Sequence, residues 1–199
     1  MTGTSPISVL YVDDEPSLLE IARIFLERSG DMRVDTALSA VDGLGKLKNQ
    51  AYDAIVADYQ MPDMYGIVFL KLINDTGLGI PFILFTGRGR EEVVIEAINN
   101  GAAFYLQKGG DPKAQFAELA HKIRQAVARK QAEEALRESE ENYRALFDEA
   151  ADLIAIVDST GKFLDLNRRY EEESGYSKPE MIGKNALTCG IVTKQKTAY

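Results

Sequence analysis

The sequence predicts an α/β fold with a five-stranded, doubly wound parallel sheet, and two observations lead to this prediction. Short apolar runs rich in β-branched residues alternate with segments whose apolar residues recur at helical spacing. The runs show no alternation of apolar and polar residues, which is typical of strands covered on both faces. Right-handed crossovers between successive strands would place helices on both sides of the sheet.

Each strand is expected to be followed by a helix within residues 1–127. The expected strands are 7–12, 32–37, 53–57, 80–86 and 102–106. The expected helices between them are 16–29, 39–47, 66–73 and 91–99. Pro16 suits a first helical turn, and Ser39 with Asp42 three residues later forms a capping signature.

The composition changes twice beyond this region. A helix capped by Asp111 is expected to continue through a charged segment without Gly or Pro, where opposite charges recur four residues apart. A hairpin is expected at 153–158 and 162–166, followed by short helices that begin near Asn167 and Ser177. The expected organisation is a first domain at 1–127, a helical linker at 128–147 and a partial domain at 148–199.

Composition excludes several functional classes. The 23 Lys and Arg against 31 Asp and Glu give a net charge of -8 without a basic block, so nucleic acid is not an expected partner. The single cysteine, Cys189, cannot form an intramolecular disulfide. No apolar stretch approaches the ~20 residues that span a bilayer, and the N-terminus lacks a signal core, so no membrane partner and a cytoplasmic location are expected.

Polar residues follow the apolar runs where the expected strands end. Asp13 and Asp14 follow the first strand, Asp58 follows the third, Thr86 ends the fourth and Lys108 follows the fifth. The carboxyl ends of parallel strands meet at one edge of the sheet, where such folds bind ligands. Carboxylates there suit Mg²⁺, and an aspartate beside a metal, a cation and a hydroxyl suits phosphoryl transfer to the carboxylate. The implied product is an aspartyl phosphate.

The order and spacing of these residues resemble the receiver domain of two-component response regulators. Met61-Pro62 after Asp58, and Tyr105 before Lys108, belong to the same resemblance. It implies a flavodoxin-like receiver fold, no enzymatic activity beyond self-phosphorylation and autodephosphorylation, and a sensor histidine kinase or phosphotransfer protein as phosphoryl donor.

The resemblance also implies a role for each residue of the site. These roles are Asp58 as phosphoacceptor, Asp13, Asp14, Asp58 and the Gln60 carbonyl as Mg²⁺ ligands, Lys108 and Thr86 as phosphoryl-binding groups, and Thr86 with Tyr105 as the switch. The sequence departs from the family pattern at Gly87, where alanine or serine is usual, and at Gly109, where proline is common. Both departures concern the mobility of loops more than the chemistry.

The C-terminal part resembles the first half of a PAS domain. The resemblance rests on residues 141–147, the hairpin, and the segment from Asn167 through Gly175-Tyr176 to Lys184. Such domains run to about 100 residues, so the three later strands and a sealed cofactor cavity are not expected here. Flavin photosensors of this class carry a cysteine directly after a Gly-Arg-Asn-like triplet, whereas Ala186 follows Gly183-Lys184-Asn185.

A homodimer through the linker helix and tail is a further expectation. A two-stranded sheet is marginal alone, so its apolar face needs a cover. The sparse seam that would lie beside this face comprises Leu136, Tyr143 and Phe147. The apolar face itself is expected to comprise Leu153, Ile154, Ile156, Phe163 and Leu166.

Some of these residues also allow a purely structural role. Asp13 or Asp14 could merely cap the helix that begins near Pro16, and Tyr105 could be an ordinary core aromatic. His121 superficially resembles a kinase phosphoacceptor, but no proline follows it and the sequence holds no ATP-binding domain. A surface or helix-packing role is therefore expected for His121.

Three alternative functions would require other residues than those present. A Mg²⁺-dependent phosphatase with an aspartyl-phosphate intermediate would need a second acid at the position of Gln60. A flavin binder would need a first loop rich in Ser, Thr and Gly, where Asp13-Asp14-Glu15 stands. A DNA-binding regulator would need a basic module after the linker, and the expected hairpin is not one.

Overall fold

The computed structural model describes residues 5–87 and 91–186. The chain divides into two compact units, Met1–Glu133 and Glu134–Tyr199. Cys189, for which the sequence excludes an intramolecular disulfide, lies outside the described residues.

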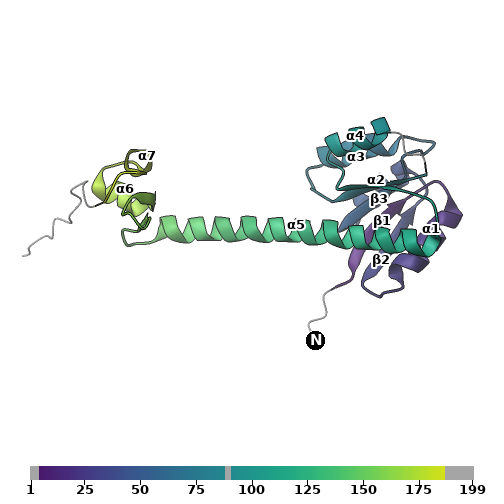
Figure 1. Cartoon of the computed structure of the whole chain (residues 1–199), viewed down its shortest axis with the longest axis horizontal. Helices are drawn as coiled ribbons and strands as arrows, with labels where there is room; N and C mark the ends of the chain where they lie inside the picture. Colours follow the sequence, from purple (N-terminus) through teal and green to yellow (C-terminus); the bar gives the residue numbers. More distant parts are fainter. Residues whose placement is uncertain (1–4, 88–90, 187–199) are drawn as a thin grey trace, which may run out of the picture. The chain divides into compact units, whose positions relative to one another are not determined.

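The first unit contains a five-stranded parallel sheet with the strand order β2-β1-β3-β4-β5. Strands β2, β1 and β3 are labelled in this order in Figure 1. The strands are β1 (Ile7–Val12), β2 (Met32–Ala37), β3 (Ala54–Ala57), β4 (Phe82–Thr86) and β5 (Phe104–Gln107). The predicted sheet is confirmed. Strand β4 begins two residues later than predicted, and Pro81, which has no N–H to donate to a ladder, directly precedes it.

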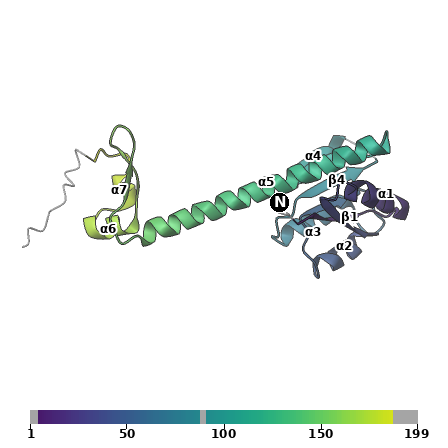
Figure 2. The same cartoon turned by 90° about the horizontal axis from the view of Figure 1, so that it is seen from below.

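Helices cover both faces of this sheet (Figure 1, Figure 2). The helices of the first unit are α1 (Pro16–Glu27), α2 (Ala40–Leu47), α3 (Gly66–Asp75), α4 (Glu91–Asn99) and the first part of α5 (Pro112–Glu149). Leu10 and Val12 pack in a core with residues of α2, α3 and α4, whereas Val9 and Tyr11 pack in a second core with α1 and α5. Strand β1 is therefore buried on both faces, as its unbroken apolar run predicts.

Side-chain hydrogen bonds are present at the predicted caps Ser39 and Asp111. The Ser39 hydroxyl accepts a hydrogen bond from Asp42 N at 3.1 Å, and the Asp111 carboxylate accepts one from Ala114 N at 2.9 Å. Helix α1 has Glu15 at its N-cap without a side-chain hydrogen bond. The interpretation of Asp13 or Asp14 as the cap of α1 is therefore wrong.

Helix α5 is one continuous helix of 38 residues, as the charged segment predicts. The predicted pair of Arg129 and Glu133 is present, with Nε 2.8 Å from Oε1, and Arg137 pairs with Glu141 at 2.9 Å. None of the helices in the described ranges has the length and apolar character that crossing a bilayer requires.

The second unit contains a small antiparallel sheet of β6 (Ala155–Val157) and β7 (Phe163–Leu166) with helices α6 (Arg168–Ser174) and α7 (Lys178–Met181). Asn167 is completely buried and does more than the predicted capping. Its Oδ1 accepts hydrogen bonds from Tyr170 N at 3.1 Å and Ile154 N at 2.9 Å, and its Nδ2 donates to Asp152 O at 2.9 Å. Asn167 thus ties the start of α6 to the segment before β6.

Two expectations about apolar surfaces need correction. Phe163 and Leu166 do not belong to an exposed face, because they pack with Tyr170 and Met181 in the core of the second unit. Phe147 does not lie on an exposed seam either, since only 5% of it is exposed. The exposed apolar residues along this part of α5 are Leu136, Tyr143 and Leu146, with 62%, 46% and 75% of their surfaces exposed.

Candidate functional site

Strand register brings two acids together at the carboxyl edge of the first sheet. Val12 of β1 pairs with Ala57 of β3, so Asp13 and Asp58 each follow one member of the same pair. Both acids are buried, with 1% and 7% of their surfaces exposed. This juxtaposition is the one that the strand-end pattern predicts.

Lys108 lies between the two acids. Its Nζ is 2.6 Å from Asp13 Oδ2 and 2.9 Å from Asp58 Oδ1. Thr86, the last residue of β4, pairs with Gln107 at the end of β5, and Lys108 N donates a hydrogen bond to Thr86 O at 2.7 Å. The register between β4 and β5 therefore delivers the lysine to the acids. One ammonium faces two carboxylates, so this trio keeps a net charge of −1.

Burial and neighbouring charges shift the pKa values of Asp13 and Lys108. Burial raises the pKa of Asp13, and the charge of Asp58 adds to this, while the hydrogen bond from Lys108 opposes it. Burial lowers the pKa of Lys108, but its hydrogen bonds and ion pairs with Asp13 and Asp58 outweigh burial, so that the pKa is raised overall. The lysine therefore stays charged at neutral pH and holds the acids together.

The loop after β3 is fixed by backbone hydrogen bonds near Asp58. Gln60 N donates to Asp58 Oδ2 at 2.9 Å, and Gly66 N donates to Tyr59 O at 2.8 Å. A Cβ at Gly66 would stand 2.2 Å from Asp58 O and 2.8 Å from Leu84 Cδ1. Only glycine allows α3 to begin this close to the backbone of Asp58.

The remaining predicted metal ligands lie at the rim. Asp14 and Gln60 are exposed and line an open hollow of about 560 Å³ together with Asp63. Within residues 5–87 and 91–186, no three His, Cys, Asp or Glu side chains form a metal-binding group. The oxygen donors nevertheless fit Mg²⁺ chemically. The two buried carboxylates of Asp13 and Asp58 share the single ammonium of Lys108, which leaves negative charge for a metal ion to offset. Mg²⁺ also takes few protein ligands, because water and phosphate complete its coordination.

Tyr105 of β5 is half-buried against the core shared with α3 and α4. Within the described part of the chain, its buried hydroxyl has no hydrogen-bond partner. Burial raises the pKa of Tyr105, and the charge of Asp58 contributes further. Tyr105 therefore lies within electrostatic reach of Asp58, although it packs as a core aromatic as well.

Tyr11 is a neighbour of the site that the sequence interpretation did not single out. It is completely buried, and its ring packs edge-on to Phe85 with 6.5 Å between centroids. Burial raises its pKa well above the usual value, and the charges of Asp13 and Asp58 add to this. Tyr11 is the single aromatic residue of β1 and lies two residues before Asp13, which was the available signal.

Two further features of the first unit lie outside the trio of Asp13, Asp58 and Lys108. His121 is exposed on α5, in agreement with the expected surface role.

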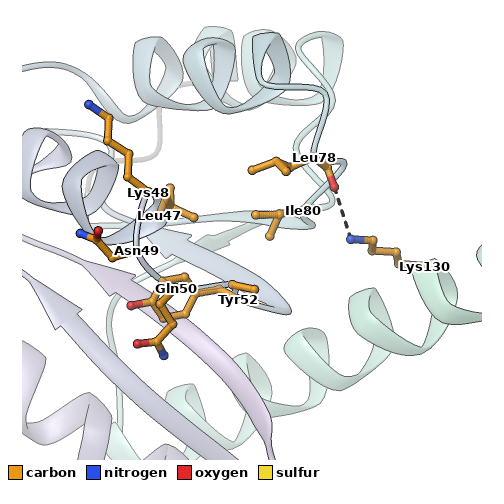
Figure 3. Close-up of a pocket in the computed structure, with 9 residues that line it drawn as sticks. Leu47, Lys48, Asn49, Gln50, Tyr52, Leu78, Ile80 and Lys130 are labelled. Carbon is orange, nitrogen blue, oxygen red and sulfur yellow. Dashed lines mark hydrogen bonds between the residues drawn. The ribbon is translucent and has the colours of Figure 1, made fainter.

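A hollow of about 400 Å³ is lined by the segments that precede β3 and β4, and its apolar floor includes Leu47 and Ile80 (Figure 3). Lys130 Nζ donates to Leu78 O at 3.5 Å at its edge, while the amine of Lys48 points away from the floor. The polar groups around this hollow do not point toward one another, whereas Asp13, Asp58 and Lys108 meet at the carboxyl edge of the sheet.

Comparison with known families agrees with this geometry. A model described as the response regulator receiver domain matches residues 9–124, more than half of the chain. The chain belongs to this receiver family. A second model, described as a PAS domain, matches residues 141–193. The protein therefore joins a receiver domain to a PAS domain, with α5 between the two matched regions.

Individual relatives match the receiver region. Response regulator Rre1 of Synechocystis is 34% identical over 129 residues, which cover 64% of this chain and 54% of the relative. A response regulator receiver domain from Clostridium thermocellum is 30% identical with a TM-score of 0.57, covering 63% of this chain and 98% of that chain. A beryllofluoride-activated receiver domain, DrrB, is 25% identical with a TM-score of 0.52, covering 60% and 98%. The chain spans about half the length of the curated relatives it matches.

Proposed function

We propose that this chain is a phosphoacceptor signalling protein of a two-component phosphorelay, phosphorylated on Asp58. The observation that carries the proposal is the Lys108 ammonium, 2.6 Å from Asp13 and 2.9 Å from Asp58 at the carboxyl edge of a receiver sheet. Two buried acids beside a partly buried ammonium suit a hard cation and a phosphoryl group, whereas an ordinary strand end would be packed with apolar side chains.

The proposed reaction transfers a phosphoryl group to a carboxylate oxygen of Asp58. The new bond joins this oxygen to phosphorus, and the bond between phosphorus and the donor breaks, so that the electron pair leaves with the donor. Lys108 stabilises the charge on the phosphoryl oxygens, and the Thr86 hydroxyl is the proposed donor of a further hydrogen bond. Asp13, Asp14 and the Gln60 carbonyl, with Asp58, would hold Mg²⁺, which offsets the negative charge of the acids and the phosphoryl group.

The proposed switch involves Thr86 and Tyr105. Attraction of the Thr86 hydroxyl to the phosphoryl oxygens would favour the inward position of Tyr105 and shift a pre-existing equilibrium. The buried hydroxyl of Tyr105 supports this proposal, because an inward position is already compatible with the core. The proposed donor is a sensor histidine kinase or a phosphotransfer protein, and catalysis beyond phosphorylation and dephosphorylation of Asp58 is not part of the proposal.

Incubation with acetyl phosphate and Mg²⁺, followed by peptide mass spectrometry, tests the proposal. One phosphoryl group is expected on Asp58, with none in Asp58→Asn or in EDTA. Asp53→Asn is the matched control, because Asp53 lies at the other end of the same strand, where it accepts from Ser8 N. Labelling that persists in Asp58→Asn or in EDTA would contradict the proposal.

Amide exchange with and without beryllofluoride tests the proposed switch. Unchanged exchange between Thr86 and Lys108 on adding beryllofluoride would contradict the switch.

A further inference from the structure

Asp63 joins the loop after β3 to the first turn of α2. Its Oδ2 accepts a hydrogen bond from Val41 N at 2.8 Å, and its Oδ1 accepts one from Met64 N at 3.0 Å. Val41 is the second residue of α2, where backbone N–H groups have no partner within the helix. Asp63 therefore caps α2 from a loop that lies 22 residues further along the chain.

Ser39 caps the same helix end but belongs to a different segment. Its hydroxyl accepts from Asp42 N, the N–H next to that of Val41. Both residues stabilise the start of α2, but only Asp63 connects this helix to the loop that carries Asp58 and Gln60. A comparison of the two therefore separates support of the helix from support of the loop.

The loop from Asp58 to Gly66 has anchors on either side of Gln60. Its start is held by the bond from Gln60 N to Asp58, and Met61 is buried in the core with 6% of its surface exposed. Asp63 adds an attachment to α2, and it lines the same hollow as Asp14 and Gln60. The position of the Gln60 backbone in this hollow thus depends on anchors that flank it.

We propose that Asp63 is a positioning residue for the Mg²⁺ site. By holding the loop against α2, it fixes the Gln60 carbonyl relative to Asp14 and Asp58. This inference rests on the proposed function, because it concerns the ligands of the same ion. Removing a hydrogen-bonded support of a metal ligand typically lowers the affinity for the metal by about 10–100-fold. Because Asp63 is exposed, we expect its removal to lower the Mg²⁺ affinity by about tenfold.

Calorimetric titration of the full chain with Mg²⁺ tests the inference on three variants. Asp63→Ala removes the acceptor and should weaken Mg²⁺ binding about tenfold. Asp63→Asn keeps a carbonyl oxygen for Val41 N and should bind Mg²⁺ nearly as tightly as the unmodified chain. Ser39→Ala removes the other cap and should lower the urea midpoint, as Asp63→Ala does, without weakening Mg²⁺ binding. Urea unfolding of each variant verifies that it is folded.

The outcomes separate the inference from the proposed function. Wild-type affinity in Asp63→Ala overturns the positioning role, and so does an equal loss in Ser39→Ala, which would assign the effect to α2 stability. An equal loss of Mg²⁺ affinity in Asp63→Asn would show that the effect comes from the charge of Asp63, and this would also overturn its positioning role. If the unmodified chain neither binds Mg²⁺ nor accepts phosphate, the proposed function fails and this inference fails with it.

Discussion

Gly66 is the residue where the site depends most directly on the absence of a side chain. Gly66→Ala would place a Cβ 2.2 Å from Asp58 O, and backbone cannot yield as a flexible side chain does. We expect a loss of about 1–3 kcal/mol in the free energy of unfolding, the usual range for overpacking. The displaced backbone of Asp58 should also slow phosphate uptake. Urea unfolding and the acetyl phosphate assay measure the two effects.

Gly45 provides the matched control for this substitution. It lies within α2, and a Cβ there would meet nothing within 4 Å. Gly45→Ala should therefore stabilise the protein by about 0.5–1 kcal/mol, because alanine has the higher helix propensity. Equal effects of the two substitutions would contradict the steric argument for Gly66.

The residues of the site were predictable from sequence to different degrees. Asp13, Asp58 and Lys108 each follow a short apolar run, and the parallel sheet requires such strand ends to meet. Asp63 and Tyr11 were not predicted as parts of the site. The cap that Asp63 forms on α2 is a long-range contact without a local sequence pattern. An aromatic residue in a strand is common, so Tyr11 alone did not indicate that it is buried within reach of the charges of Asp13 and Asp58. The ligand and switch roles of Asp14, Gln60, Thr86 and Tyr105 remain proposals.

At the scale of elements, α5 is attached to the loop between α1 and β2 by a bidentate ion pair. Arg124 Nε lies 2.6 Å from Asp31 Oδ2, and Nη2 lies 3.2 Å from Oδ1. The hydrogen bond from Arg124, together with that from Ser29, lowers the pKa of Asp31 from 3.8 to about 2. An acid whose pKa is lower in the folded state stabilises the fold above its unfolded pKa. This contribution is lost as the pH falls from about 4 towards 2.

Asp31→Asn should remove this pH-dependent contribution. About 44% of the Asp31 side chain is exposed, so solvent screening limits the expected loss near neutral pH to about 0.5–1 kcal/mol. Urea midpoints of both proteins should differ at pH 6 and converge as the pH approaches 2. Glu133→Gln, in the more exposed pair with Arg129, is the control and should have a smaller effect. If the difference between the two urea midpoints grew as the pH fell, the ion pair of Asp31 with Arg124 would not be its cause.

The elements themselves were largely predictable, with differences at their ends. Ser39 and Asp111 marked helix starts correctly because the cap is a local interaction. The fifth strand was predicted at 102–106 but lies at Phe104–Gln107. Its bounds follow from pairing with β4, which the local sequence does not encode. The domain boundary after residue 127 stays a prediction, because α5 continues through it without a break.

At the scale of the whole molecule, exposed apolar residues of α5 favour self-association. Leu136 and Tyr143 are seven residues apart and Leu146 follows three later, which is the spacing of a coiled-coil seam. In the second unit, Leu153, Val157 and Leu164 are also exposed, with 53%, 45% and 55% of their surfaces accessible. A two-stranded sheet with such a surface is marginal alone. A second copy of this chain would shield both surfaces.

We therefore predict a homodimer through α5 and the second unit, and Leu136→Glu combined with Leu146→Glu tests it in the full chain. Two buried leucines contribute roughly 3–6 kcal/mol together, so the double variant should weaken association at least about 100-fold. Light scattering at tens of micromolar should then give the dimer mass for the unmodified chain and the monomer mass for the variant. Ile24→Glu is the control, because Ile24 is nearly as exposed as Leu136, at 60% against 62%, but lies on α1. A monomeric unmodified chain, or a double variant that remains dimeric, would show that this seam does not hold two copies together, and the exposed leucines would then need another partner.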